Sequence, residues 1–125
     1  MSKILFLLFS VNAFVFAKTF DEKVNELALK IEPEVIEWRH WFHANAELSN
    51  REFKTSKKIT KILKKIGYTP QTGIAKTGVV AILNGGKPGP VVALRADIDG
   101  LPVKERVDIP WASKMTGEYN GEIVP

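Results

Sequence analysis

The sequence contains no cysteine among its 125 residues. This absence excludes a disulfide framework, cysteine-ligated zinc, iron–sulfur clusters and a cysteine nucleophile. Histidine is scarce too, with two residues, so any chemistry must use oxygen or imidazole groups. The formal charge of +4 is small and does not argue for a nucleic-acid partner. With 45% hydrophobic and 26% charged residues, the composition is that of a globular protein of one ordinary domain at most.

The first 17 residues have the pattern of a cleaved secretion signal. Met1-Ser2-Lys3 is a basic start, the stretch from Ile4 to Phe16 is apolar, and Val15-Phe16-Ala17 is a suitable cleavage site. The apolar stretch is shorter than the roughly 20 residues that span a bilayer, and polar residues interrupt it. We therefore predict a signal peptide at residues 1–17, no stable membrane span, and a periplasmic or secreted mature chain that begins at Lys18.

Apolar residues at helical spacing predict three helices, of which two precede residue 45. Thr19 and Glu22 form a capping-box pattern ahead of a helix that runs to about Ile31. Pro33 fits the first turn of a second helix with a broad aromatic surface. That helix carries His40 and, one turn later, His43, with no third possible metal ligand nearby. This favours packed histidines over a metal site.

The third predicted helix opens on a second capping box, Ser49 with Glu52, and Gly67 is a natural left-handed stop. Its apolar stripe is surrounded by basic residues, which we interpret as a solvated face: Arg51, Lys54, Lys57, Lys58, Lys61, Lys64 and Lys65.

The pattern then becomes extended. Gly78–Leu83 is a continuous apolar run rich in β-branched residues, which predicts a strand buried on both faces. A turn at Asn84–Pro90 leads to a second predicted strand, Val91–Ile98, with one wholly apolar face. Helices followed by such strands predict an α/β fold in which helices pack on a mixed sheet.

Three charged residues, Arg95, Asp97 and Asp99, share the other face at the carboxyl end of this strand. Carboxylates on a central strand are costly unless they are paired or bound to a cation. One interpretation is a structural Arg–Asp network. The other is an active site, because a turn at Gly100-Leu101-Pro102 would expose the acids at a strand end where open α/β sheets collect catalytic groups.

Two segments resemble a known family. Arg39–Glu52 resembles the signature Arg-x-x-Leu/Phe-His-x-x-Pro-Glu-Leu-Ser-x-x-Glu of the zinc-type amidohydrolase and peptidase group, with Ala46 in place of the usual proline. Thr77–Ala81 and Leu94–Val103 continue the match in order, so the resemblance extends from about Val35 to the last residue. The family includes N-acyl-amino-acid amidohydrolases, hippurate hydrolases, auxin-conjugate hydrolases and carboxypeptidases.

The resemblance implies that residues 18–125 form the N-terminal portion of a metallo-exopeptidase-like catalytic domain. In the family, two divalent ions (zinc, manganese or nickel) and a glutamate hydrolyse the amide bond of N-acyl amino acids or small peptide-like conjugates. The family's His-x-Cys-Gly-His-Asp metal segment does not occur in this sequence. We therefore expect no metal ligand here, an inactive isolated chain, and, in a complete enzyme, a small-molecule substrate, no nucleic acid, and a homodimer through a later domain.

One residue can be carried over as catalytic, Asp99, which by resemblance would orient a metal ligand without binding the metal itself. Asp97 would lie near that site, with Arg95 as its counter-charge. The alternative is an exported, non-catalytic binding or structural module derived from the same family.

Overall fold

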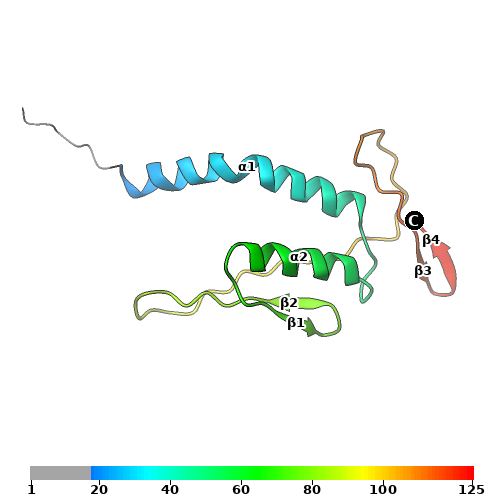
Figure 1. Ribbon diagram of the computed structural model, residues 1–125. Coiled ribbons are helices and arrows are strands. Elements are labelled where there is room, and N and C mark those ends of the chain that lie inside the picture. Colours follow the sequence, from blue (N-terminus) through cyan, green and yellow to red (C-terminus); the bar gives the residue numbers. More distant parts are fainter. Residues whose placement is uncertain (1–17) are drawn as a thin grey trace, which may run out of the picture. The chain divides into compact units, whose positions relative to one another are not determined.

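The computed structural model describes residues 18–125 (Figure 1), and the predicted signal peptide lies outside the described residues. The chain divides into two compact units, one ending at Pro33 and one comprising Glu34–Pro125, and each is considered by itself. No helix within residues 18–125 is long and apolar enough to cross a membrane.

Helix α1 (Phe20–Ala44) is a single helix, so the prediction of two helices is wrong. Its predicted capping box is confirmed: the Thr19 N–H donates to the Glu22 carboxylate at 2.8 Å, and the Glu22 N–H donates to the Thr19 hydroxyl at 3.2 Å. Pro33 lies inside the helix. A proline removes one helical hydrogen bond and ordinarily ends or kinks a helix. Here helix-favouring glutamates flank it on both sides, and one lost bond does not interrupt the helix.

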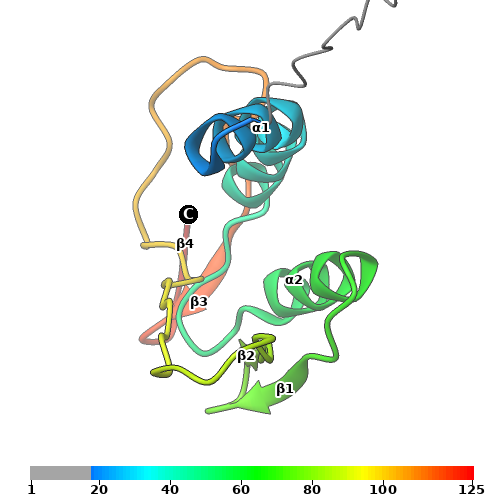
Figure 2. The same cartoon turned by 90° about the vertical axis from the view of Figure 1, so that its left-hand side faces the viewer.

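Helix α2 (Phe53–Lys65) is the third predicted helix. Its predicted stop is confirmed, because Gly67 has a φ of +96°, in the left-handed region. The Gly67 N–H donates to the Lys64 carbonyl at 3.1 Å, and the Tyr68 N–H donates to the Leu63 carbonyl at 2.9 Å. Helix α2 lies over a β-hairpin made of the next two strands (Figures 1 and 2).

All strands of the described residues belong to two antiparallel hairpins. Strand β1 (Gln71–Ile74) pairs with β2 (Gly78–Val80), and β3 (Gly117–Tyr119) pairs with β4 (Glu122–Val124). The predicted strand at residues 78–83 is therefore shorter than expected and only half-buried at its first two residues. The mixed sheet is not present within residues 18–125.

The predicted strand at residues 91–98 is wrong for the structure described. These residues have no strand conformation, and Val91 and Leu94 are each 98% exposed. An extended apolar segment becomes a strand only when a neighbouring strand takes up its backbone hydrogen bonds and another layer covers its side chains. Residues 18–125 provide neither for this segment.

The small core lies at the turn after α1. Leu48, 8% exposed, is the buried hydrophobic residue among those described. It forms an isolated parallel bridge with Gly100, whose N–H donates to the Glu47 carbonyl at 2.7 Å. Gly117 approaches from β3 so closely that a Cβ there would lie 2.9 Å from the Leu48 side chain. This turn therefore brings together segments that are about fifty residues or more apart in the sequence.

Candidate functional site around the turn after helix α1

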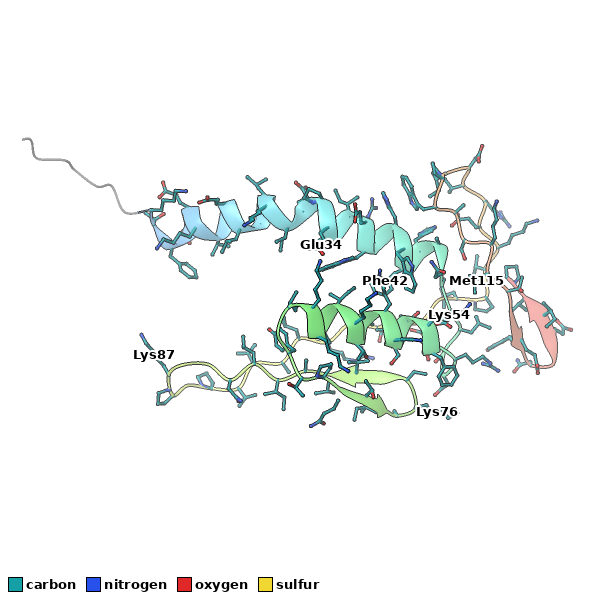
Figure 3. All side chains as sticks on the ribbon, viewed as in Figure 1. Glu34, Phe42, Lys54, Lys76, Lys87 and Met115 are labelled. Atoms are coloured by element: carbon teal, nitrogen blue, oxygen red, sulfur yellow. The ribbon has the colours of Figure 1, made fainter. Side chains whose placement is uncertain are left out.

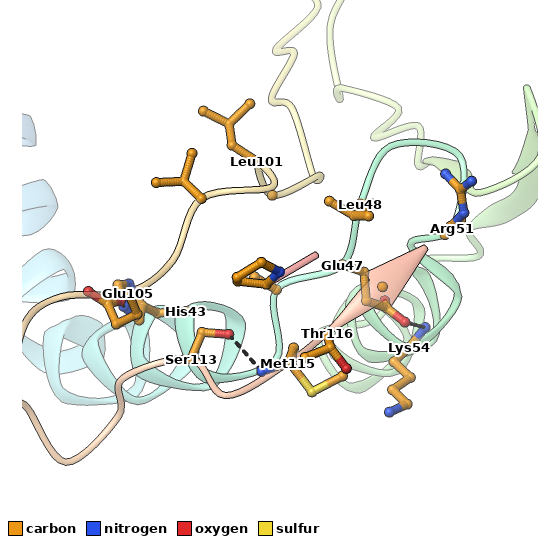
Figure 4. A pocket seen from close by; sticks show the side chains of 15 residues that line it. His43, Glu47, Leu48, Arg51, Lys54, Leu101, Glu105, Ser113, Met115 and Thr116 are labelled. Atoms are coloured by element: carbon orange, nitrogen blue, oxygen red, sulfur yellow. Dashed lines mark hydrogen bonds and ion pairs between the residues drawn. The ribbon is translucent and has the colours of Figure 1, made fainter. Parts of the chain in front are cut away.

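A cavity of about 400 Å³ opens beside this turn (Figure 4). One wall is the end of α1, the turn and the start of α2, and the other is the segment 100–117. Its polar side chains come from both walls: His43, Glu47, Arg51, Lys54, Glu105, Ser113 and Thr116. Leu48, Leu101, Val103 and Met115 supply apolar lining.

Glu47 caps the N-terminus of α2. Its carboxylate accepts hydrogen bonds from the Lys54 N–H at 3.2 Å, the Thr55 N–H at 2.8 Å and the Thr55 hydroxyl at 2.9 Å. A carboxylate at this position satisfies free helix N–H groups and interacts favourably with the helix dipole. The predicted capping box of Ser49 and Glu52 is wrong, because the Glu52 side chain makes no capping bond. Sequence reasoning missed Glu47, since an acid several residues ahead of a helix is a weak signal.

Glu52 instead faces β2. It is 5% exposed, and its carboxylate accepts a hydrogen bond from the Thr77 hydroxyl at 2.7 Å. Burial acts to raise the pKa of Glu52, but hydrogen bonds from Thr77 and from the nearby backbone outweigh it and leave the pKa below its ordinary value. Glu52 therefore fixes the start of α2 to the β1–β2 hairpin as an ionised group.

The two histidines of α1 both contact the segment 104–112. The His43 Nε2 lies 2.5 Å from the Glu105 carboxylate, and this hydrogen bond lowers the pKa of Glu105. The His40 ring stacks on Trp111 with the ring centroids 3.6 Å apart and an angle of 14° between the planes. His40 thus packs against this segment, as predicted from the aromatic neighbours, whereas the exposed His43 contacts it through the ion pair with Glu105.

The predicted site residues lie elsewhere. Arg95 and Asp97 form an ion pair at 2.6 Å with side chains 84% and 68% exposed, so the expectation of buried carboxylates is wrong. The physical reason is that the sheet which would bury them is not present within residues 18–125. Asp99 is exposed and lines a second cavity of about 430 Å³, together with Phe42 and Ile59.

The described residues do not fit a metal centre. No group of three or more histidines, aspartates or glutamates within residues 18–125 is placed to hold a metal ion. Asp97 is engaged with Arg95, and both histidines contact the segment 104–112.

Comparison with known proteins shows what the chain is similar to. The chain is 42% identical over 97 residues to thermostable carboxypeptidase 2 of Saccharolobus solfataricus, covering 77% of this chain and 25% of that protein. It is 40% identical over 96 residues to the N-acyl-L-amino acid amidohydrolase of Geobacillus stearothermophilus, covering 77% and 26%. The crystal structure of a dinuclear metal-binding peptidase of the M20 family from Bacillus subtilis matches with a TM-score of 0.65 at 39% identity, covering 69% of this chain and 24% of that one. The chain is homologous to the M20 metallopeptidases and amidohydrolases.

The resemblance read from Arg39–Glu52 and Leu94–Val103 is thereby confirmed at the level of the M20 family. The chain spans about a quarter of the length of these M20 relatives. No protein-family model matches it. The structural match supports an M20-like fold over part of the chain, although the described residues contain two helices and small antiparallel sheets in place of a mixed sheet.

Proposed function

We propose that this chain takes part in the metal-dependent hydrolysis of amide bonds in N-acyl amino acids or small peptide-like conjugates, as part of the catalytic fold of a longer enzyme. The observation that carries the proposal is the 40% identity over 96 residues with an N-acyl-L-amino acid amidohydrolase. The structural match to a dinuclear metal-binding M20 peptidase supports it independently.

In this proposal the divalent ions, zinc, manganese or nickel, are held by residues of the longer enzyme. The described residues contain no group of three or more possible metal ligands. Asp99 acts as a positioning residue that orients a ligand of the metal. Its place beside an open cavity leaves its carboxylate accessible to further polypeptide. Asp97 and Arg95 balance the charge beside it.

A chimera tests the proposal. The matching stretch of the Geobacillus amidohydrolase is replaced by Glu34–Pro125, the second compact unit of this chain. We expect metal-dependent release of free amino acid from N-acetyl amino acids or hippurate by the chimera, and none by the isolated 125-residue chain. A folded, metal-loaded chimera without activity would contradict the catalytic proposal and favour the alternative of a non-catalytic module.

We also propose that the chain is exported, with cleavage after Ala17. The basic start and short apolar stretch of residues 1–17 support this. The test is mass spectrometry of the protein recovered from medium, periplasm and membranes. A mature N-terminus at Lys18 is the expected result, and an intact chain that stays in the membrane would contradict it.

A further inference from the structure

Glu47 makes two kinds of contact that join segments far apart in the sequence. Its side-chain carboxylate accepts hydrogen bonds from the Lys54 N–H, the Thr55 N–H and the Thr55 hydroxyl, all in the first turn of α2 (Figure 3). Its backbone carbonyl accepts a hydrogen bond from the Gly100 N–H at 2.7 Å. One residue therefore connects the start of α2 to the segment that carries Asp99.

The neighbours of Glu47 in the chain keep this contact in register. Leu48 forms a parallel bridge with Gly100, and its buried side chain lies against Gly117 of β3. A Cβ at Gly100 would lie 3.0 Å from the Ala46 Cβ, so the two backbones already approach each other closely. The turn after α1 therefore leaves Gly100 little room to move.

The hydrogen bond to Glu47 fixes the peptide group that joins Asp99 to Gly100. A peptide group is planar, so holding its N–H sets the orientation of the plane and, with it, the ψ angle of Asp99. The Asp99 side chain is exposed beside a cavity and is not held by close packing. The backbone at residues 99–100 therefore decides where the Asp99 carboxylate lies.

We propose that Glu47 is a positioning residue for Asp99. The Glu47 carboxylate holds the turn on α2, and the carbonyl of the same residue holds the peptide group that follows Asp99. All of these contacts are internal to the second compact unit. Their importance for hydrolysis rests on the proposed function, which gives Asp99 its role. A catalytic group must be held to a fraction of an ångström, so loosening this turn should be costly.

Amide exchange of Gly100 tests the contact directly. Asp99-Gly100 is the one Asp-Gly pair in the sequence, so isotope labelling of the aspartate carbonyl carbon and the glycine nitrogen gives it a single NMR signal in the 125-residue chain. We expect the Gly100 N–H to be protected in the parent chain. It should exchange about tenfold faster in Glu47→Ala, which loses the hydrogen bonds to α2. Glu47→Gln should retain part of the protection, because its amide oxygen still accepts from the Thr55 N–H.

Glu52→Gln is the matched control for this measurement. Glu52 also anchors the start of α2, but its partner is the Thr77 hydroxyl in the β1–β2 hairpin. We expect Gly100 to exchange in Glu52→Gln about as slowly as in the parent chain. Equal acceleration in Glu47→Ala and Glu52→Gln would mean that Gly100 reports only overall stability, and the proposal would be wrong. Fast exchange of Gly100 in the parent chain would overturn it as well.

A double-mutant cycle in the Geobacillus chimera tests the effect on hydrolysis. Glu47→Ala should lower kcat about tenfold with little change in KM, because Asp99 is displaced while substrate binding is retained. If Glu47 acts through Asp99, the same substitution should have almost no further effect on kcat in an Asp99→Asn background. Glu52→Gln should leave kcat close to the parent value. Glu47→Gln provides the same cycle if Glu47→Ala does not fold.

The outcomes separate this proposal from the amidohydrolase proposal. In an active chimera, additive effects of Glu47→Ala and Asp99→Asn on kcat would exclude the positioning role and leave the proposed function in place. A folded parent chimera without activity contradicts the proposed function itself. The Gly100 exchange still decides, without any activity measurement, whether Glu47 holds the peptide that follows Asp99.

Discussion

At the residue scale, three glutamates of the second unit have three different structural roles. Glu47 caps helix α2, Glu52 is buried against Thr77, and Glu105 is held by His43. Each role depends on the donor that faces the carboxylate. These donors lie in different segments of the chain. The presence of a glutamate in the sequence therefore did not show which of the three roles it has.

Glu52 predicts a dependence of stability on pH. The pKa of Glu52 is lower in the folded chain than its ordinary value of 4.5, so its contribution is fully present above that pH and is lost as the pH falls through the folded pKa. Glu52→Gln should lower the free energy of unfolding by about 1 kcal/mol at pH 7 and reduce its acid dependence. Urea unfolding at pH 7 and at about pH 4 measures both effects. Glu32→Gln, at an exposed position of α1, is the control, and an equal effect there would contradict this role of Glu52.

Asp99 predicts a catalytic effect in the chimera. If Asp99 orients a metal ligand, Asp99→Asn should reduce metal affinity or turnover by roughly 10–100-fold with folding retained. Asp97→Asn should act on stability more than on turnover, because Asp97 pairs with Arg95. Asp108→Asn, on an exposed part of the segment 104–112, is a further control. Metal affinity and kcat are both measured, because a merely structural role would change neither in a folded chimera. Unchanged values in Asp99→Asn would mean that Arg95, Asp97 and Asp99 form only a structural network.

At the element scale, helix α1 continues through Pro33, and the two compact units divide at the same residue. Its two ends are stabilised in different ways: the first turn by the Thr19 and Glu22 capping box, and the last turn by contacts of His40 and His43. Pro33 lacks the N–H that would complete the hydrogen bonding of this helix.

Pro33→Ala should strengthen α1. The substitution restores one backbone hydrogen bond and removes a steric conflict, which together are worth about 3 kcal/mol in a helix interior. Because Pro33 is exposed, the gain should appear as greater helicity and thermal stability without loss of packing. Circular dichroism during thermal unfolding measures it, with Glu37→Ala, at another exposed position of α1, as control. Lower helicity in Pro33→Ala would contradict this prediction and would mean that Pro33 stabilises the helix.

At the scale of the whole molecule, many large apolar side chains within residues 18–125 are exposed. Leu48 is the buried hydrophobic residue among those described, whereas Ile82, Leu83, Val91, Val92 and Leu94 are each at least 68% exposed. A chain that buries so little apolar surface has little to offset the conformational entropy of folding.

The isolated chain should therefore be marginally stable and bind hydrophobic dyes. We expect strong dye fluorescence in native buffer and a broad, weakly cooperative unfolding transition. The Geobacillus chimera is the comparison, because there the same residues have further polypeptide to pack against. A dye-free chain with a sharp transition would favour an independent module.

The sequence by itself determined the features that depend on neighbours along the chain. The capping box at Thr19, the stop at Gly67 and the existence of α2 all follow from short spacings. The resemblance to the M20 family came from sequence motifs, and the comparisons support it. The turn of the β3–β4 hairpin also follows a local signal, Asn120-Gly121, whose φ angles are 53° and 83°. Local propensity was sufficient because the interacting groups lie within a few residues of one another.

The tertiary structure alone decided what depends on distant partners. Glu52 meets Thr77 across 25 residues and His43 meets Glu105 across 62, and no spacing rule connects them. The segment 91–98 carries the pattern of a buried strand, yet it is exposed because no strand within residues 18–125 pairs with it. An alternating pattern specifies which faces a strand would have, whereas the strand itself exists only when another segment accepts its hydrogen bonds and covers its apolar side chains.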